Sequence, residues 1–178
     1  MDDRKNRDKP EGETMAIRPI LRFPHPGLNR VCDRVTDFDA GLAALAQDLI
    51  DTMRAAPGVG ITAAHTGVNQ RVVVIELEGQ KAPRIFVNPE VLEASQETQE
   101  FNEGSVSMPG AIETVTRPAR IRLRWQSLDG KTHEEDMAGF LATCMQHEID
   151  QLDGMFWLQR LSRLKRDRLI RKWEKAQR

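Results

Sequence analysis

The segment 145–154, MQHEIDQLDG, holds the residues best suited to do chemistry. His147 and Glu148 are adjacent, as in the His-Glu-x-x-His helix, whose two imidazoles bind a metal ion beside a glutamate. The fifth position of the pattern is Gln151, so an amide stands where the second imidazole would be. Three interpretations follow: a metalloenzyme with altered ligands, a disabled metalloenzyme, or an ordinary helix that contains a His and a Glu.

The composition indicates a globular chain of one domain. The chain has 178 residues, 39% of them hydrophobic and 30% charged, which is long enough to bury a sizeable core. No apolar run approaches the roughly 18 residues of a membrane span, so a membrane is not an expected partner. DNA is not an expected partner either. Cys32 and Cys144 are too few for a disulfide framework, and we expect a cytoplasmic protein.

The two ends of the chain differ from its middle. Residues 1–14 are polar and charged, so we expect a disordered extension rather than a secretory signal. Residues 160–178 carry nine Lys/Arg and two Asp/Glu, a net charge of +7, which leaves −8 for the rest. The apolar residues that could share one face of a helix there are Leu161, Leu164, Leu169 and Trp173. Such a helix either docks by its leucines or contacts a polyanion such as ribosomal RNA.

Hydrophobic periodicity predicts the elements that must position His147 and Glu148. A helix is expected over 37–54 and another over 138–152. The expected strands cover 71–77, 84–89, 91–101, 120–125 and 131–137. A long loop is expected over 102–118, because Gly104, Pro109, Gly110 and Pro118 interrupt it. The order of helix, several strands and helices predicts an α+β fold with a mostly antiparallel sheet.

Two further segments matter once they are placed beside the helix. They read Gly58-Val59-Gly60-Ile61-Thr62-Ala63-Ala64-His65 and Glu103-Gly104-Ser105-Val106-Ser107. With Gln146-His147-Glu148-Ile149-Asp150-Gln151-Leu152, the three segments resemble the three motifs of peptide deformylases. Those motifs are Gly-x-Gly-apolar-Ala-Ala-x-Gln, Glu-Gly-Cys-apolar-Ser and Gln-His-Glu-x-Asp-His-Leu. The resemblance implies a deformylase-like domain over 15–161, followed by a basic C-terminal helix over 162–178.

The resemblance also implies a reaction. Peptide deformylases remove the N-formyl group from the initiator methionine of nascent chains. One cysteine and two histidines hold iron, zinc or nickel, and the glutamate moves protons. The motif glutamine and the backbone N–H after the cysteine stabilise the formyl oxygen. The implied partners are thus nascent N-terminal peptides, with the ribosome as a further partner through the basic helix.

Carried onto this chain, the resemblance retains part of the site. The first histidine ligand is His147 and the proton-transfer glutamate is Glu148. The backbone donor is Val106, which with Val59 and Gly60 would also line the peptide groove. These positions imply that the groove for a formyl-methionine peptide is kept.

Three other positions depart from the family. Ser105 stands at the cysteine ligand, Gln151 at the second histidine ligand and His65 at the glutamine. A serine hydroxyl is neutral and an amide oxygen is hard, so both replace soft or borderline ligands poorly. Loss of two ligands removes on the order of 6–8 kcal/mol, a weakening of about 10⁴ to 10⁶ in affinity. We therefore expect no tightly bound metal and no ordinary deformylase activity, with His65 hydrogen-bonded to Ser105, Gln151 or Glu148.

Under two alternative interpretations, the protein is an active enzyme. In the first, His65, His147 and Glu148 form a rearranged site for iron, zinc or nickel, and the protein is an active or weakly active deformylase. In the second, Ser105, His65 and Glu148 act as nucleophile, base and orienting group of a serine hydrolase. Cys144, one turn before His147, is expected to be a core residue rather than a replacement thiolate.

Overall fold

The structure is a computed structural model that describes residues 16–178. The expected extension over 1–14 lies outside these residues. The α-helices and strands, in chain order, are α1 (Ala40–Ala55), β1 (Gly60–Thr62), β2 (Val72–Ile75), β3 (Arg84–Ala94), β4 (Thr98–Ser105), β5 (Met108–Pro118), β6 (Arg120–Gln126), β7 (Thr132–Ala138), α2 (Gly139–Leu152) and α3 (Arg163–Ala176). Short 3₁₀ helices are η1 (Pro26–Asn29), η2 (Ala63–Thr66) and η3 (Trp157–Arg160). None of the helices in the described part is long and apolar enough to cross a membrane.

The larger sheet has five strands in the order β1-β2-β3-β6-β7, and all its pairings are antiparallel. The β-branched run of β2 is buried on both faces. Val73 and Ile75 belong to the core that α2 covers, whereas Val72 and Val74 belong to the core that α1 covers. This alternation follows from the two-residue period of a strand. The α+β fold with a mostly antiparallel sheet is confirmed.

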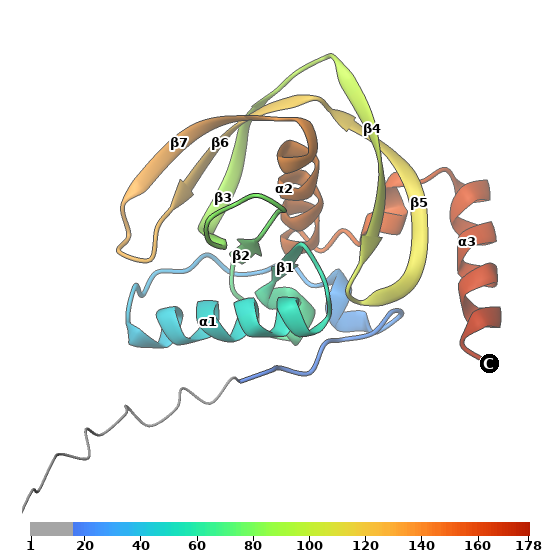
Figure 1. Cartoon of the computed structure of the whole chain (residues 1–178), viewed down its shortest axis with the longest axis horizontal. Coiled ribbons are helices and arrows are strands. Elements are labelled where there is room, and N and C mark those ends of the chain that lie inside the picture. Colours follow the sequence, from blue (N-terminus) through green and yellow to red (C-terminus); the bar gives the residue numbers. More distant parts are fainter. Residues whose placement is uncertain (1–15) are drawn as a thin grey trace, which may run out of the picture.

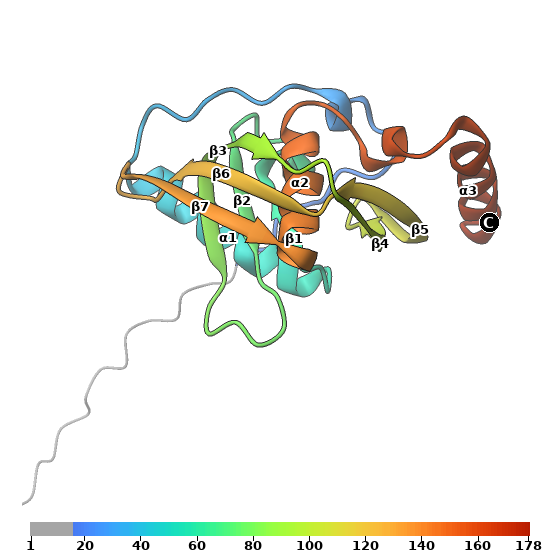
Figure 2. The same cartoon turned by 90° about the horizontal axis from the view of Figure 1, so that it is seen from above.

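Helix α2 lies at the centre of the molecule, between the five-stranded sheet and the β4–β5 hairpin (Figures 1 and 2). Its apolar residues Met145, Ile149 and Leu152 pack in the same core as β2 and β3. Ten of its 14 residues are buried, because it has neighbours on nearly every side. His147 turns toward the hairpin, where it contacts Glu103 of β4, and Glu148 lies against Gly60 of β1.

The β4–β5 hairpin and strand β3 each correct a prediction. Residues 102–118 are not a long loop: they form the end of β4 and all of β5, paired from Thr98↔Pro118 to Ser105↔Met108. Residues 84–94 form one strand where the sequence pattern predicted a break after residue 89. That strand pairs with β6 through register shifts, so the proline at position 89 interrupts the ladder without ending the strand.

The C-terminal helix α3 lies beside β5, at the far edge of the molecule from the five-stranded sheet (Figure 1). Leu169 is buried, and the Trp173 indole N–H donates to the Pro109 carbonyl at 2.8 Å. Leu164 is 77% exposed, so the prediction that it shares the docking face is wrong. Leu161 is buried just before the helix starts. The helix is therefore docked by few side chains and presents a basic outer surface.

Candidate functional site

The three motifs meet at one cavity of about 660 Å³, a volume typical of ligand sites. The first motif contributes Val59, Gly60 and His65 to its wall. From the second come Ser105 and Val106, and from α2 come His147 and Glu148. The structure thus brings every site residue predicted from the sequence to this cavity, except Gln151.

Two glycines allow the motifs to approach one another. A Cβ atom at Gly60 would lie 2.7 Å from Glu148 Oε1, and one at Gly58 would lie 2.7 Å from Val106 Cγ1. Real Cβ contacts are longer than this, so a side chain at either position would force its neighbour to move. The missing side chains therefore let β1 lie against α2 and against the β4–β5 turn.

Alternate residues of β4 face α2 and contact it along its length. Gln99 donates to the Gly139 carbonyl at 2.7 Å and to Thr143 Oγ1 at 2.9 Å. Phe101 packs on Phe140, with ring centroids 5.3 Å apart. The next residues in this alternation, Glu103 and Ser105, bring the second motif to the polar part of the helix.

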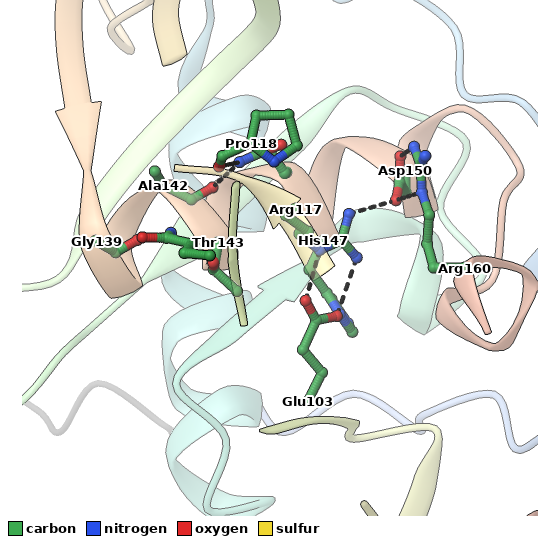
Figure 3. A network of polar contacts seen from close by, with 11 residues as sticks. Glu103, Arg117, Pro118, Gly139, Ala142, Thr143, His147, Asp150 and Arg160 are labelled. Carbon is green, nitrogen blue, oxygen red and sulfur yellow. Dashed lines mark hydrogen bonds and ion pairs between the residues drawn. The ribbon is translucent and has the colours of Figure 1, made fainter. Parts of the chain in front are cut away.

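Glu103 is the centre of a buried charge network (Figure 3). It accepts hydrogen bonds from His147 Nδ1–H at 2.8 Å and from Arg117, at 2.5 and 2.9 Å. Arg117 also donates to Asp150 at 2.8 Å, and Asp150 accepts two bonds from Arg160. The Arg117 and Glu103 side chains are each 3% exposed. The network fixes the ring of His147, because one of its two nitrogens is held by a buried carboxylate.

The network sets the charges on this side of His147. Burial alone would raise the pKa of Glu103, but hydrogen bonds from His147 and Arg117 outweigh it and lower that pKa to about 2. Burial alone would lower the pKa of His147, but the bond to Glu103 and the charges of Glu148 and Glu103 give a net rise. Glu103 is therefore a carboxylate near neutral pH, and it favours the protonated form of His147.

Glu148 has a different environment from Glu103. Burial raises the pKa of its carboxyl to about 7, although the charge of His147 opposes the rise. Its Oε2 atom is buried and has no hydrogen-bond partner among residues 16–178. Glu148 lines the cavity, so an unsatisfied polar group lies at its wall. Such an unpaired buried acceptor costs about 1–3 kcal/mol of folding stability.

His65 is held by its own 3₁₀ turn and not by the residues expected from the sequence. Its Nδ1 accepts the backbone N–H of Thr62 at 3.0 Å and lies 2.9 Å from the Thr62 hydroxyl. The expectation of a bond to Ser105, Gln151 or Glu148 is wrong, because Thr62 caps the turn and takes Nδ1. Burial, reinforced by the charge of His147, lowers the pKa of His65 to about 3. The neutral ring therefore carries its proton on Nε2, which is buried and unpartnered in the described chain.

The side chains at the two replaced ligand positions are already engaged in hydrogen bonds to the backbone. Ser105 Oγ accepts the backbone N–H of Ser107 at 3.1 Å. Gln151 is 2% exposed, and its Nε2 donates to the Leu28 carbonyl at 2.6 Å. Gln151 thus joins α2 to η1 and lies outside the cavity wall. Of the three family ligand positions, only His147 places an imidazole at the cavity.

The two alternatives from the sequence, a rearranged metal site and a serine hydrolase, each require particular side chains to lie together. Across residues 16–178, no three His, Cys, Asp or Glu side chains are grouped so as to hold a metal ion. The hydroxyl of Ser105 has no hydrogen bond to His65 or Glu148 in the described structure. Cys144 is buried at the cavity wall, and burial and the charge of Glu148 raise the pKa of its thiol to about 12. A neutral thiol of this kind is a poor metal ligand and a poor nucleophile.

The mouth of the cavity is apolar. Val59 is 45% exposed, Ile112 64% and Phe140 41%, and all three line the cavity. Half of the exposed large hydrophobic residues in the described chain therefore lie at one opening. Arg22 also lines it and donates to the Val106 carbonyl at 2.6 Å. An apolar rim around a polar floor suits a peptide with an apolar side chain and a polar end group.

Sequence reasoning missed Arg22, Arg117 and Thr143 as residues of the site or its support. Arg117 faces inward because it shares the alternation of Val115 on β5, a signal that the loop prediction over 102–118 concealed. Thr143 lies four residues before His147 and was visible on the same helical face. Arg22 carries no local pattern, since its contact with Val106 spans 84 residues of sequence.

Comparisons with known proteins agree with the geometry. The family described as polypeptide deformylase matches residues 17–167. A peptide deformylase-like protein of Rhizobium meliloti is 56% identical over 92% of this chain and 95% of its own length. Another of Brucella melitensis is 57% identical over 92% of this chain and all of its own length. The crystal structure of a peptide deformylase from Legionella pneumophila superposes with a TM-score of 0.85 at 39% identity, covering 91% of this chain and 96% of that one. The chain belongs to the polypeptide deformylase family.

Proposed function

We propose that the protein binds N-formylated peptide ends in its cavity without metal-dependent deformylation. One observation carries this proposal: the Gln151 amide is bonded to the Leu28 carbonyl outside the cavity wall, so His147 alone remains of the family's metal ligands there. Ser105 adds a neutral hydroxyl, which is a weak ligand for a transition metal. The residues present do not fit the metal of an ordinary deformylase.

The unpaired polar atoms of the cavity match a formamide group. His65 offers a buried Nε2–H donor and Glu148 a buried oxygen acceptor. A formyl group on a peptide nitrogen offers one carbonyl acceptor and one N–H donor, so it can satisfy both atoms. The apolar rim of Val59, Ile112 and Phe140 would cover the side chains that follow. The protein would thus act as a peptide deformylase-like pseudoenzyme in nascent-chain processing.

The test is binding and turnover of a formyl-Met-Leu peptide by the purified full chain. We expect saturable binding by calorimetry and no release of formate above the buffer rate. The matched variant His65→Phe keeps an aromatic ring but removes the donor, and we expect about 3- to 10-fold weaker binding. Formate release that saturates with peptide and stops on chelation would contradict the proposal and favour the rearranged site of His65, His147 and Glu148.

The basic surface of α3 supports a second partner of the same function, the ribosome. Arg171, Lys172 and Lys175 are exposed and have no carboxylate partner within the described residues. Glu113 on β5 and Asp167 lie near the other basic side chains of the helix. A row of uncompensated cations on a docked helix suits the phosphates of ribosomal RNA.

Co-sedimentation with ribosomes at several salt concentrations tests this contact. A charge-reversal variant of α3 carries Glu at positions 171, 172 and 175, and its control carries Glu at the exposed basic positions 30, 81 and 131. We expect the α3 variant alone to lose binding, and the binding of the unchanged protein to fall steeply with salt. Equal loss in both variants would show that net charge, and not α3, governs the association.

A further inference from the structure

One wall of the cavity is the face of α2 that runs from Glu148 back to Phe140. Its residues Thr143, Cys144 and His147 also line the cavity. Thr143 precedes His147 by four residues, which is about 6 Å along the helix axis. For a peptide whose formyl group lies between His65 and Glu148, this wall offers the first side chain a path along Thr143 toward Phe140.

Thr143 is the buried polar residue on this path. It is 2% exposed, and its Oγ1 accepts a hydrogen bond from Gln99 Nε2 at 2.9 Å. A helical threonine commonly donates its hydroxyl proton to the carbonyl four residues earlier, as Thr52 does to Asp48 at 2.6 Å in α1. For Thr143 that carbonyl belongs to Gly139, and Gln99 already donates to it at 2.7 Å.

The hydroxyl proton of Thr143 thus has no acceptor among residues 16–178. A hydroxyl carries one donor and two acceptor sites, and here the bond from Gln99 fills an acceptor site only. Thr143 is one of the residues that line the cavity, so this unfilled donor belongs to its wall, beside the path of the first side chain. A ligand side chain that ends in a hydrogen-bond acceptor would satisfy this donor, whereas a hydrocarbon would leave it unpaired.

We propose that Thr143 is a specificity-determining residue that favours a first side chain with a strong hydrogen-bond acceptor, and that Gln99 is its positioning residue. This inference rests on the proposed binding of formylated peptide ends. A thioether sulfur is a weak acceptor, whereas oxidation of methionine adds a polar sulfoxide oxygen to a side chain of nearly the same shape. The ligand class is therefore an N-formyl peptide whose first residue is methionine sulfoxide or a similar acceptor.

Calorimetry with three peptides of equal length tests this preference. Their first residues are formyl-methionine sulfoxide, formyl-methionine and formyl-norleucine, which replaces the sulfur with a methylene group. We expect the sulfoxide peptide to bind about 3- to 10-fold more tightly than the norleucine peptide. In Thr143→Val the order should reverse, because the sulfoxide oxygen would be buried without a donor. Thr143→Ser keeps the hydroxyl and should keep the preference.

A variant that leaves Thr143 in place tests the positioning role of Gln99 without changing the shape of the cavity wall at Thr143. Gln99→Leu frees the Gly139 carbonyl, so the Thr143 hydroxyl can donate to it within the helix and the preference should disappear. Thermal melting confirms that each variant is folded. The same peptide order in the unchanged protein and in folded Thr143→Val would overturn this inference and leave the proposed function standing. Absence of binding for all three peptides would overturn both.

Discussion

His147 lies between two regions of opposite character. On one side, Glu103, Arg117 and Asp150 form a buried network in which every charge has a partner of the opposite sign. On the other side, His65 Nε2 and Glu148 Oε2 face the cavity without partners in the part of the chain that the structure describes. Both regions adjoin His147, yet every buried charge has a partner in one and polar atoms lack partners in the other.

The difference indicates which part of the fold is structural and which part receives a ligand. Buried polar networks are stable when fully satisfied, and costly when one member lacks a partner. The Glu103 network therefore stabilises the fold and orients His147. The cavity side keeps polar atoms that a bound peptide end can satisfy. The replaced side chains Ser105 and Gln151 are engaged in hydrogen bonds to the backbone, and Gln151 lies outside the cavity wall.

The largest expected effect on stability comes from breaking the buried network around Glu103. Arg117→Met leaves the carboxylates of Glu103 and Asp150 buried without their shared partner. Removal of one member of a buried ion pair costs about 3–5 kcal/mol, so we expect a loss of that size in the free energy of unfolding. Urea denaturation followed by tryptophan fluorescence measures it.

Arg122→Met is the matched control, because Arg122 also pairs with two carboxylates, Glu134 and Asp136. Its side chain is 39% exposed, against 3% for Arg117. Exposed pairs contribute about 0–1 kcal/mol, so the control should lose less than about 1 kcal/mol. Similar losses in the two variants would show that the network around His147 contributes no more than a surface ion pair.

The pH dependence of stability tests the cavity side, where His65 and Glu148 have unpaired atoms. The pKa of His65 is lowered from 6.5 to about 3 on folding, so its contribution to stability is present above pH 6.5 and is lost as pH falls toward 3. The pKa of Glu148 is raised from 4.5 to about 7, so its contribution is present below pH 4.5 and is lost as pH rises through 7. Between pH 4.5 and 6.5 the two slopes oppose each other.

Single variants should expose each slope. In His65→Gln, stability should fall with rising pH between 4.5 and 6.5, and in Glu148→Gln it should rise. Each slope is at most about 1.4 kcal/mol per pH unit. Glu103 and His147 contribute little here, since the lowered pKa of Glu103 acts below pH 4.5 and the raised pKa of His147 acts above 6.5. Slopes of the same sign in both variants would contradict the assigned shifts.

The smallest effect on stability is expected for a change at Gln151, one of the two replaced ligand positions. Gln151→Leu leaves the buried Leu28 carbonyl without its donor, which should cost about 1–2 kcal/mol in the free energy of unfolding. The control Gln47→Leu removes an exposed amide that donates to Asp51 one turn later in α1, at 3.2 Å. That change should cost at most about 0.5 kcal/mol. If Gln151→Leu is as mild as the control, the bond to Leu28 is not what holds Gln151.

Much of the fold was predictable because periodicity and turn residues agree with it. The helix over 37–54, the strand over 120–125 and the helix over 138–152 correspond to α1, β6 and α2 within a few residues. The prediction of a loop over 102–118 was wrong because Gly104, Pro109 and Gly110 are residue types that usually mark loops. There the pairing of β4 with β5 outweighs local preference, as tertiary context often does in strands.

The site was predictable as a set of positions but not as a set of contacts. The resemblance to peptide deformylases implied one site for His65, Val106 and Glu148, and all three line the cavity. The partner of His65 was not foreseen, although Thr62 stands three residues before it, as in a capping box. The bond from Gln151 to Leu28 spans 123 residues, and no local pattern predicts a contact of that kind.

Zinc affinity tests the central claim most directly. Competition with a chromogenic chelator would compare the unchanged protein with the double variant Ser105→Cys and Gln151→His, which restores the family's ligand set. We predict that the double variant binds one zinc ion about 10⁴ to 10⁶ times more tightly than the unchanged protein. Near-stoichiometric metal in the purified unchanged protein, or a zinc affinity within about tenfold of the double variant, would contradict the account.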